Sequence, residues 1–281
     1  MYETIARPPK IYRLAPAPLP RPSGLNARVI ADALRRRPSA IFTDIDGTLC
    51  PIVATPSEAT VREECREALR ALTLYVDLLC VLSGRPADEA WRMVRIDEAL
   101  YVGNHGAERW FRGELLRPPG IERYHARLAR AHAMLRLSLA NVPGLVFEDK
   151  GIGFAVHFRR EPAVGPEVLR VARSVAARRG LEVVERTAHV EVRPPSSEDK
   201  GSSLLALARH YGLRGLIVLG DDRVDLPAFA AARAHASETG CTAVVVGVGD
   251  VFDDELDVDI SLARPSETCA LLSSVVEILR S

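Results

Sequence analysis

The stretch Ala-Ile-Phe-Thr-Asp-Ile-Asp-Gly-Thr-Leu-Cys-Pro, residues 40–51, carries the strongest fold signal in the chain. Its first three residues form a short apolar run, which is typical of a buried strand in a parallel sheet. Asp44 and Asp46 follow at the end of that strand, and residues two apart share one face of a strand. Gly47 allows a tight turn in which Thr48 can hydrogen-bond.

Two carboxylates at the carboxyl end of a strand have a clear chemical use. One can hold a hard cation and attack an electrophile, while the other moves a proton. The same pair could also be two solvated aspartates at a polar strand end. The residues that follow along the chain decide between these interpretations.

The composition is that of a soluble globular protein. The 281 residues, 47% hydrophobic and 26% charged, suffice for one large domain or two ordinary ones. The formal net charge of zero argues against nucleic acid as the main partner, because such binding needs a basic surface. The low aromatic content of 5% argues against platforms for stacked bases.

The cysteines, at positions 50, 65, 80, 241 and 269, lack the spacing of metal ligands. We expect them to be small core residues in a reducing compartment. No apolar run has the length of a membrane span, and no signal peptide is visible. These features predict a cytoplasmic protein with no membrane partner, and we also expect a monomer.

Residues 1–38 are expected to form a separate extension. This segment is rich in proline and arginine and poor in acids, so its first part should be extended and poorly packed. Such a start also resembles an organelle transit peptide, although we favour a plain flexible extension. A short helix over residues 25–37 is plausible because its apolar residues fall roughly on one face.

From residue 40 onward, predicted strands alternate with predicted helices. The strands are expected over residues 40–45, 78–82, 99–102, 215–219, 242–247 and 257–262. The helices are expected over residues 57–73, 86–94, 199–211, 225–233 and 267–280. This rhythm predicts a parallel sheet with helices on its faces and with the carboxyl ends of its strands along one ligand-binding edge.

The rhythm changes between about residues 110 and 195. Helices are predicted over residues 121–141 and 167–179, and each is followed by a β-hairpin, over residues 146–159 and 181–193. Helix, hairpin, helix, hairpin predicts a small open sheet with two helices on one face. We predict an α/β protein whose Rossmann-like core, residues 39–110 and 195–281, holds an inserted α/β cap, residues 111–194.

Polar residues recur where the predicted core strands end or a helix begins. They are Asp44, Asp46, Ser83, Lys200, Asp221, Asp222 and Asp225. Each has an ordinary alternative, because Ser83 with Gly84 could form only a turn, Lys200 could be a solvated charge, and the last three aspartates could cap a helix. These residues occur in this order at or near the strand ends of the predicted sheet, which is hard to obtain by chance. The pattern therefore favours a single site.

In these residues the sequence resembles the haloacid-dehalogenase-like phosphatases over about residues 40–280. The resemblance implies that Asp44 is the nucleophile that forms an aspartyl-phosphate. Asp46 would protonate the leaving oxygen and then take a proton from the attacking water. Ser83 and Gly84 would bind the phosphoryl oxygens, and Lys200 would balance their charge.

The resemblance also implies a Mg²⁺ cofactor. Its ligands would be the Asp44 carboxylate, the Asp46 backbone carbonyl, Asp221 and waters, an all-oxygen shell that suits this ion. Asp222 and Asp225 would support these ligands from a second layer.

The inserted segment resembles the trehalose-6-phosphate phosphatases. The matching stretches are residues 103–108, 148–151, 157–159, 190–195 and 199–201. The resemblance implies that the sugar is bound by Asn104, Glu148, Lys150, Arg159 and Glu191. Glu148 and Lys150 would share one face of a hairpin, although a cross-strand charge ladder would show the same pattern.

Three further residues near these motifs have open roles. His105 and His157 are interpreted as structural imidazoles, because Asp46 already carries the proton in this mechanism. Arg85 could reach the substrate or pair locally.

One motif departs from the family pattern Gly-Asp-Asp-x-Thr-Asp-Glu. Val224 stands in place of the threonine, Leu226 in place of the glutamate, and Pro227 follows. Groups around a metal tune it, so this change is expected to affect the rate and the metal affinity.

The resemblance therefore implies a Mg²⁺-dependent phosphatase that hydrolyses trehalose 6-phosphate and pairs functionally with trehalose-6-phosphate synthase. Two alternatives stay open. One is a phosphatase of another sugar phosphate, of the sucrose-phosphate or glucosyl-phosphoglycerate type. The other is a catalytically weak sugar-phosphate sensor.

Overall fold

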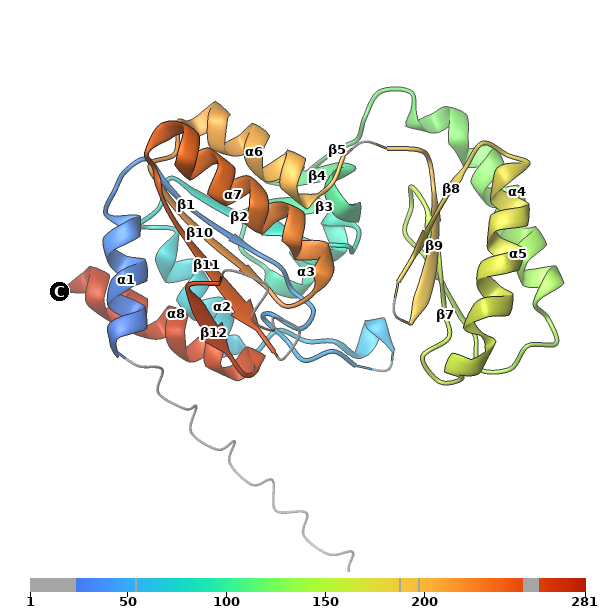
Figure 1. Ribbon diagram of the computed structural model, residues 1–281, viewed down its shortest axis with the longest axis horizontal. Coiled ribbons are helices and arrows are strands. Elements are labelled where there is room, and N and C mark those ends of the chain that lie inside the picture. The colour runs from blue at the N-terminus through green and yellow to red at the C-terminus, as the bar shows by residue number, and fades with distance from the viewer. Residues whose placement is uncertain (1–23, 54, 187, 197, 250–257) are drawn as a thin grey trace, which may run out of the picture.

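The computed structural model describes residues 24–53, 55–186, 188–196, 198–249 and 258–281. The expected extended start of the chain, residues 1–23, lies outside the described residues, as does the first residue of the last predicted strand. The described chain forms a large sheet covered by helices and, beside it, a smaller sheet with two helices (Figure 1).

The large sheet has eight strands in the order β12-β11-β10-β1-β2-β3-β4-β5. Their bounds are β1 (Ser39–Thr43), β2 (Leu78–Leu82), β3 (Leu100–Gly103), β4 (Glu108–Phe111), β5 (Glu114–Leu116), β10 (Gly215–Gly220), β11 (Thr242–Val248) and β12 (Ile260–Leu262). From β12 to β3 all neighbouring strands are parallel, which confirms the predicted parallel core.

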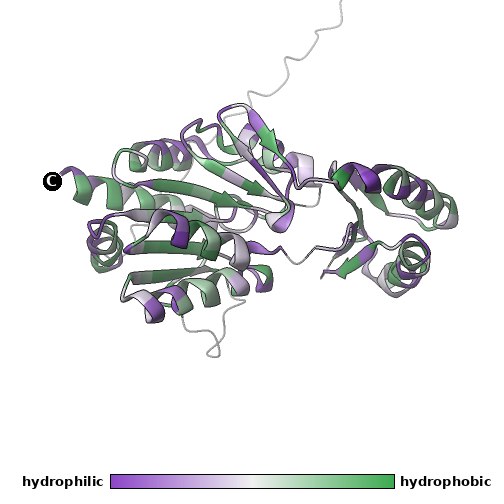
Figure 2. Cartoon of the chain, turned by 90° about the horizontal axis from the view of Figure 1, so that it is seen from above, coloured by the Kyte–Doolittle hydropathy of each residue, from purple (hydrophilic) through white to green (hydrophobic). Residues whose placement is uncertain are grey.

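Strand β1 is central because it is apolar on both faces. Every residue from Ser39 to Thr43 is buried, and the strand pairs with β10 on one side and β2 on the other. Ile41 belongs to the hydrophobic cluster on one face of the sheet, and Phe42 belongs to the cluster on the opposite face. The hydropathy colouring shows mostly green strands between layers of helices (Figure 2).

Helices cover both faces of the large sheet. One face packs against α1 (Gly24–Leu34), α2 (Glu63–Leu72), α3 (Ala87–Val94) and α8 (Pro265–Arg280). The other packs against α6 (Lys200–Tyr211) and α7 (Leu226–Thr239). None of the described helices has the combination of length and apolar character that crossing a membrane requires.

The small sheet is antiparallel, in the order β6-β7-β9-β8. Its strands are β6 (Val146–Asp149), β7 (Phe154–His157), β8 (Glu182–Glu185) and β9 (His189–Arg193), and its helices are α4 (His125–Ser138) and α5 (Gly165–Ala177). Both helices cover the face that points away from the large sheet (Figure 1). The opposite face is therefore turned toward the large sheet.

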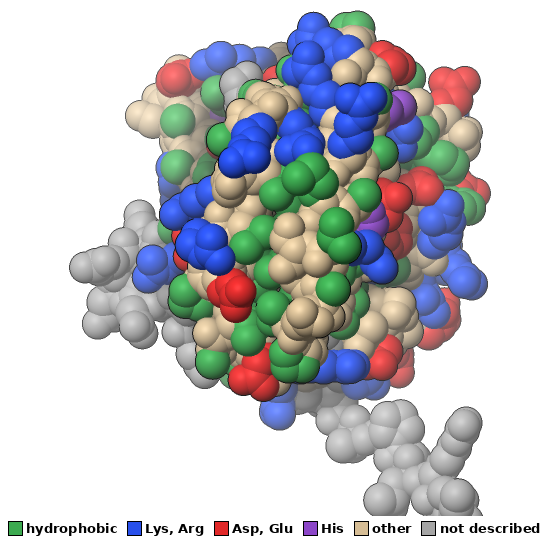
Figure 3. All heavy atoms as spheres, turned by 90° about the vertical axis from the view of Figure 1, so that its right-hand side faces the viewer, with side chains coloured by type: hydrophobic (Ala, Val, Ile, Leu, Met, Phe, Trp, Pro, Cys, Tyr) green, Lys and Arg blue, Asp and Glu red, His purple; other side chains and the backbone are tan. Residues whose placement is uncertain are grey.

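The outer side of these helices is basic. Between residues 117 and 180 there are twelve Lys and Arg residues and five Asp and Glu residues, so the zero net charge of the chain is unevenly distributed. Exposed arginines on α4 and α5 are Arg127, Arg130, Arg136, Arg170 and Arg173. Lys and Arg side chains gather over the upper and left parts of this face (Figure 3).

The antiparallel hairpin β4–β5 was not predicted. It extends the large sheet through short, partly exposed strands, and its turn places Arg112 and Gly113 at positive φ. Strands of three or four residues with few buried side chains leave little periodic signal. The proposed division between core and cap at residue 111 falls inside this hairpin.

Two predicted helices begin later than expected because 3₁₀ turns precede them. The turn Pro56–Glu58 ends at Ala59, which is extended, so α2 begins only at Glu63. The turn Ile121–Tyr124 likewise precedes α4. Three further 3₁₀ turns in the described part of the chain are Asn104–Gly106, Pro162–Val164 and Arg223–Asp225.

Candidate active site

Asp44 lies directly after β1, at the carboxyl edge of the parallel strands. Its backbone amide donates to the Leu219 carbonyl at 3.1 Å, which continues the pairing of β1 with β10. Its Oδ1 accepts a hydrogen bond from the Ile45 amide at 2.7 Å. The residue is only 8% exposed, so the carboxylate is held by the sheet and largely removed from water.

Lys200, the first residue of α6, neutralises part of this buried charge. Asp199 caps the helix by accepting from the Ser202 amide, in a reciprocal capping box. Lys200 Nζ lies 2.8 Å from Asp44 Oδ2 and 2.7 Å from Asp225 Oδ1. Burial by itself lowers the pKa of the Lys200 ammonium, but the two carboxylates outweigh it and raise that pKa above its usual value.

Asp221 approaches the turn that contains Gly47. Thr48 Oγ1 donates to Asp221 Oδ1 at 2.8 Å. Gly47 has φ +82°, and a Cβ at this position would lie 1.8 Å from Asp221 Oδ2. Only glycine therefore fits here, because the turn needs a positive φ and the carboxylate occupies the space of a side chain.

Asp225 fixes the segment that follows β10. Its Oδ2 accepts hydrogen bonds from the amides of Asp221 and Asp222 at 3.0 and 3.2 Å. The Asp222 carboxylate instead accepts from the Val224 amide at 2.5 Å and caps the following 3₁₀ turn. Asp222 therefore has the helix-capping contact that the sequence left open as an alternative.

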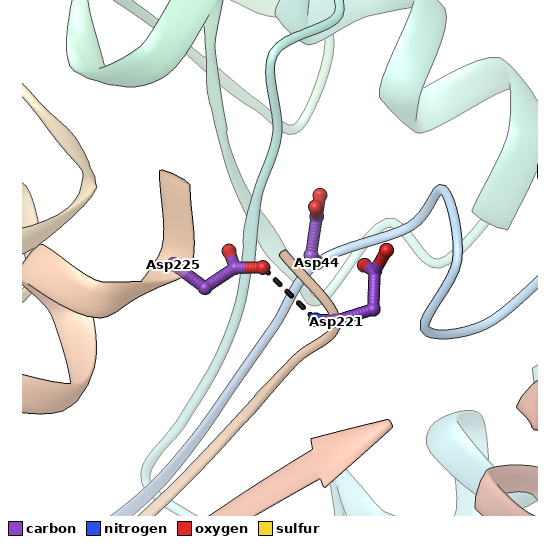
Figure 4. Close-up of side chains that lie close together, drawn as sticks. All are labelled: Asp44, Asp221 and Asp225. Carbon is purple, nitrogen blue, oxygen red and sulfur yellow. Dashed lines mark hydrogen bonds between the residues drawn. The ribbon is translucent and has the colours of Figure 1, made fainter. Parts of the chain in front are cut away.

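The three acidic residues Asp44, Asp221 and Asp225 form a group that could hold a metal ion. One ligand oxygen from each lies within 4.8 Å of the others. The carboxylates of Asp44 and Asp221 point to the same side, and Asp225 reaches the Asp221 backbone (Figure 4). Asp225, which the sequence suggested as a supporting residue, is thus a member of this group, while the Asp46 carboxylate pairs elsewhere.

The carboxylates of the group repel one another. Burial, together with neighbouring carboxylates, raises the pKa of Asp44 to about 7, against the opposing effect of Lys200. Burial and the charges of Asp44 and Asp225 raise the pKa of Asp221 to about 8. Because oxygen ligands and excess negative charge are what a hard divalent cation requires, these residues fit such an ion.

Asp46 faces the same cleft but is bound by Arg85. Arg85 Nε lies 2.6 Å from Asp46 Oδ2, and Arg85 Nη2 lies 2.8 Å from Oδ1. Arg85 also pairs with Glu89 and donates to the Pro56 carbonyl at 2.9 Å. Arg85 thus pairs locally, and it also lines the cleft.

The predicted phosphate loop, Ser83-Gly84-Arg85, follows β2. Ser83 is 1% exposed, and its Oγ accepts a hydrogen bond from the Arg85 amide at 3.2 Å. Gly84 lines the cleft between the two sheets. The loop therefore presents backbone toward the cleft, while the Ser83 hydroxyl bonds within the loop.

The cleft between the large and the small sheet has a volume of about 190 Å³. The core contributes Asp44, Asp46, Gly84, Lys200, Asp221 and Asp222 to its lining. The strands of the small sheet and the turns beside them contribute Glu148, Lys150, His157, Arg159, Arg186, His189 and Glu191. Asn104, in contrast, lines a neighbouring cavity of about 260 Å³ and donates to the Lys150 carbonyl at 3.1 Å.

Glu191 is the best-connected side chain of the small sheet in this cleft. It pairs with Lys150, and its oxygens lie 3.3 Å from His105 Nε2 and 3.4 Å from His189 Nε2. Burial alone would raise the pKa of Glu191, but Lys150 and the two histidines hold it well below its usual range. Glu191 is therefore a fixed anion in the cleft.

Glu148 and Arg159 also have partners. Glu148 Oε2 lies 2.6 Å from His157 Nε2, and Arg159 Nη1 donates to the Val53 carbonyl at 2.8 Å. Burial would raise the pKa of Glu148, but His157 and Lys150 lower it, so this side chain is also an anion. His157 thus acts as the partner of a cleft carboxylate, which agrees with its interpretation as a structural imidazole.

Sequence reasoning missed Arg186 and His189. The Nε atom of Arg186 is buried, and among the described residues it has no hydrogen-bond partner. His189 could have been found, because it precedes Glu191 by two positions on β9 and so shares its face. Arg186 lies outside the strands, where no periodicity indicates which way a side chain points.

Proteins of known sequence give the family context for this site. The chain is 35% identical over 228 residues to the trehalose-phosphate phosphatase of Mycobacterium tuberculosis, a match that covers 76% of this chain and 56% of that protein. This chain therefore spans about half the length of the mycobacterial trehalose-phosphate phosphatases that it matches.

Solved structures establish the fold. The C-terminal domain of the trehalose-6-phosphate phosphatase of Candida albicans matches with a TM-score of 0.72 and 18% identity, covering 94% of this chain and 99% of that one. A haloacid dehalogenase-like hydrolase from Bacteroides thetaiotaomicron matches with a TM-score of 0.58 and 16% identity, covering 86% and 98%. The predicted haloacid-dehalogenase-like fold is thereby confirmed.

The sequence itself settles the family. Residues 42–255 match the family model described as Trehalose-phosphatase. This range includes Asp44, Asp221 and Asp225 and the whole small sheet. With this match over most of its length, the chain belongs to the trehalose-phosphatase family.

Proposed function

We propose that the protein is a Mg²⁺-dependent phosphatase that hydrolyses trehalose 6-phosphate to trehalose and phosphate through an aspartyl-phosphate. The observation that carries the proposal is the contact of Asp44 with Lys200, close to Asp221 and Asp225. These residues lie at one side of a cleft whose opposite side holds charged residues such as Glu148, Lys150 and Glu191. Family membership supports the substrate class.

The first step is attack by the nucleophile. An Asp44 carboxylate oxygen forms a bond to phosphorus while the bond from phosphorus to the sugar oxygen breaks. Asp46 gives its proton to that leaving oxygen. Lys200 lowers the repulsion between the carboxylate and the phosphoryl group, since its ammonium lies 2.8 Å from Asp44.

The second step reverses the roles. Asp46, now ionised, takes a proton from a water molecule as the water oxygen attacks phosphorus, and Asp44 is released. Asp46 is proposed for both steps because its side chain is one-third exposed at the cleft wall, where Arg85 fixes its position. As the proton donor of the first step, Asp46 would release the Arg85 contact on the oxygen that carries the proton. Mg²⁺, held by Asp44, the Asp46 backbone carbonyl and Asp221, would supply charge neutralisation at the phosphoryl oxygens.

The sugar is proposed to bind against the small sheet. Glu148, Lys150, Arg159 and Glu191 line the cleft, and charged groups bind hydroxyls more strongly than neutral ones do. Asn104 is proposed to act indirectly, since its amide holds the Lys150 backbone. Ser83 and Gly84 are proposed to bind phosphate, Gly84 through its backbone in the cleft.

The decisive experiment is a substrate panel. Phosphate release is measured from trehalose 6-phosphate, sucrose 6-phosphate and glucose 6-phosphate, with and without Mg²⁺. Fast, Mg²⁺-dependent release from the trehalose ester alone supports the whole proposal. Release from another ester would support the proposed chemistry with a different sugar as substrate. Tight binding of an ester without phosphate release would support the sensor alternative.

A Glu148→Gln variant should separate sugar recognition from chemistry. We expect kcat/KM for trehalose 6-phosphate to fall about 10- to 100-fold, because a charge-assisted hydrogen bond is lost. Activity toward p-nitrophenyl phosphate, which has no sugar, should change far less. Equal losses on both substrates would contradict the proposed role of the small sheet, and a Glu185→Gln variant on the exposed side of β8 serves as a control.

The carboxylate group predicts how Mg²⁺ stabilises the protein at different pH values. Because the pKa values of Asp44 and Asp221 are raised to about 7 and 8, these two side chains bind more protons in the metal-free folded protein than in the unfolded chain between about pH 4 and 8. These two groups therefore lower stability as pH rises through that range. Mg²⁺ must displace those protons, so the Mg²⁺-dependent rise in Tm should be larger at pH 8 than at pH 5.5.

The control for this measurement is an Asp221→Asn variant, in which one proposed ligand is lost. Its Tm should respond weakly to Mg²⁺ at both pH values. A wild-type response that is equal at the two pH values, or absent, would argue against a metal at these carboxylates.

We further propose the division of the chain into a core, an inserted cap and an N-terminal extension, with two changes to the predicted bounds. The helix α1 packs on the large sheet and is counted with the core, and the cap begins after the hairpin β4–β5. A functional pairing with trehalose-6-phosphate synthase, a cytoplasmic location and a monomeric state also remain proposals. Size-exclusion chromatography with light scattering tests the last of these.

A further inference from the structure

The turn that connects β3 to β4, residues 104–107, has an unusual backbone. Asn104 has φ +49° and His105 has φ +57°, in the left-handed region that residues other than glycine rarely adopt. Both residues are buried. Such a conformation persists only where its surroundings fix it, and the contacts of this turn show what fixes it.

Toward the core, the turn is bound to the phosphate loop, Ser83-Gly84-Arg85. The Asn104 amide donates to the Arg85 carbonyl at 2.8 Å, and the His105 amide donates to the Ser83 carbonyl at 3.0 Å. The imidazole lies directly on Gly84, since a Cβ at that glycine would be 2.6 Å from His105 Cε1. The position of His105 relative to the predicted phosphate loop is therefore fixed by these contacts.

Toward the small sheet, the same imidazole meets Glu191. His105 Nε2 lies 3.3 Å from Glu191 Oε2, and both side chains are buried. Burial lowers the pKa of His105 to about 4, so the ring is neutral at neutral pH and has one proton to donate. A neutral ring that faces a carboxylate through Nε2 carries its proton on that nitrogen.

Glu108 anchors the turn from its other end. Its carboxylate, fully buried, accepts hydrogen bonds from the Ala87 amide at 2.9 Å, from Asn104 Nδ2 at 2.8 Å and from Arg117 Nε at 3.0 Å. Ala87 begins α3 just after the phosphate loop, and Arg117 follows β5 on the way to the small sheet. The position of the imidazole is thus set by core elements.

We propose that His105 is a positioning residue that holds Glu191, and with it the sugar-binding side of the cleft, at a fixed distance from the phosphate loop. This inference rests on the proposed function and adds a residue to it. A sugar phosphate can contact the sugar-binding residues and the phosphate loop at once only if the two are at the right distance from each other. A misplacement by about 1 Å already lowers the rate strongly. An aryl phosphate has no sugar, so its binding does not depend on this distance.

The test compares three variants. His105→Asn keeps a residue type that tolerates positive φ but is too short to reach Glu191. His105→Gln replaces the ring by a side chain whose amide can occupy the place of Nε2. His125→Ala removes an exposed histidine of α4 and is the matched control.

For His105→Asn we expect KM for trehalose 6-phosphate to rise about 10- to 100-fold, the loss expected for a hydrogen bond to a charged group. The kinetic constants for p-nitrophenyl phosphate should change less than about 3-fold. His105→Gln should restore most of the KM, and His125→Ala should behave like the wild type. A purely structural histidine would instead lower Tm and reduce activity toward both substrates alike, which would overturn the proposal.

A second measurement does not depend on the substrate. In the unliganded protein, hydrogen exchange of backbone amides at residues 148–153 and 189–193 should be faster in His105→Asn than in the wild type, with α6 and β10 unchanged. Unchanged exchange in those segments would refute the positioning role whatever the enzyme hydrolyses. If the wild type fails on trehalose 6-phosphate while exchange changes as expected, the proposed substrate is wrong and the role of His105 stands.

Discussion

An Asp44→Asn variant is expected to lose phosphatase activity by about 10⁴-fold or more, because the amide nitrogen and oxygen cannot form the acyl-phosphate that a carboxylate forms. The loss should appear as a fall in kcat for every phosphate ester, including p-nitrophenyl phosphate. The measurement is phosphate release at saturating substrate and Mg²⁺.

The fold of this variant should survive. Asp44 is buried beside other carboxylates that raise its pKa, so replacing it by a neutral residue of the same shape relieves repulsion while Lys200 keeps Asp225 as a partner. We expect a Tm no lower than that of the wild type in the absence of Mg²⁺. Asp32→Asn on the exposed side of α1 is the control, and an Asp44→Asn enzyme within 10-fold of the wild type would falsify the nucleophile assignment.

A Lys200→Ala variant should lose both activity and stability. Removing the ammonium leaves Asp44 and Asp225 buried without their cation, and such uncompensated charges typically cost about 3–5 kcal/mol of unfolding free energy. Activity should fall at least about 10³-fold, since the charge that offsets the phosphoryl group is gone. Urea unfolding at pH 7 without metal measures the first effect, and phosphate release measures the second.

Two controls separate these effects. Adding Asp225→Asn to Lys200→Ala should recover part of the stability, because one buried charge is removed, but should recover no activity. Arg209→Ala breaks the exposed ion pair between Arg209 in α6 and Glu238 in α7. This change should lower the free energy of unfolding by less than about 1 kcal/mol. A Lys200→Ala protein as stable as the wild type would show that the buried carboxylates are compensated in another way.

The order of strands and helices in the parallel core could be predicted from local pattern. A strand that is buried on both faces has an unbroken run of apolar residues. The runs before Asp44, Ser83 and Asp221 could therefore be recognised as strands. Where apolar runs were short or exposed, as in the hairpin β4–β5 or the delayed start of α2, the pattern was too weak and boundaries were missed.

The identities of the side chains at the site were also available from the sequence, but their partners were not. Asp46 with Arg85, Glu148 with His157 and Glu191 with His105 are pairs between separate strands and turns. The choice between substrate contact and local pairing for Arg85 depends on which carboxylates the packed structure brings within reach. No spacing rule supplies that information.

Local sequence thus determined the strands of the parallel core, the carboxyl edge on which Asp44 and Asp221 lie, and the turn at Gly47, because apolar runs and turn residues act over a few positions. Only the tertiary structure brought carboxylate oxygens of Asp225, Asp44 and Asp221 within 4.8 Å of one another, made Asp222 the cap of a turn, and placed His105 between the predicted phosphate loop and Glu191. These outcomes depend on distances of a few ångströms between segments far apart in the chain. The packing of the two sheets, rather than any local propensity, sets those distances.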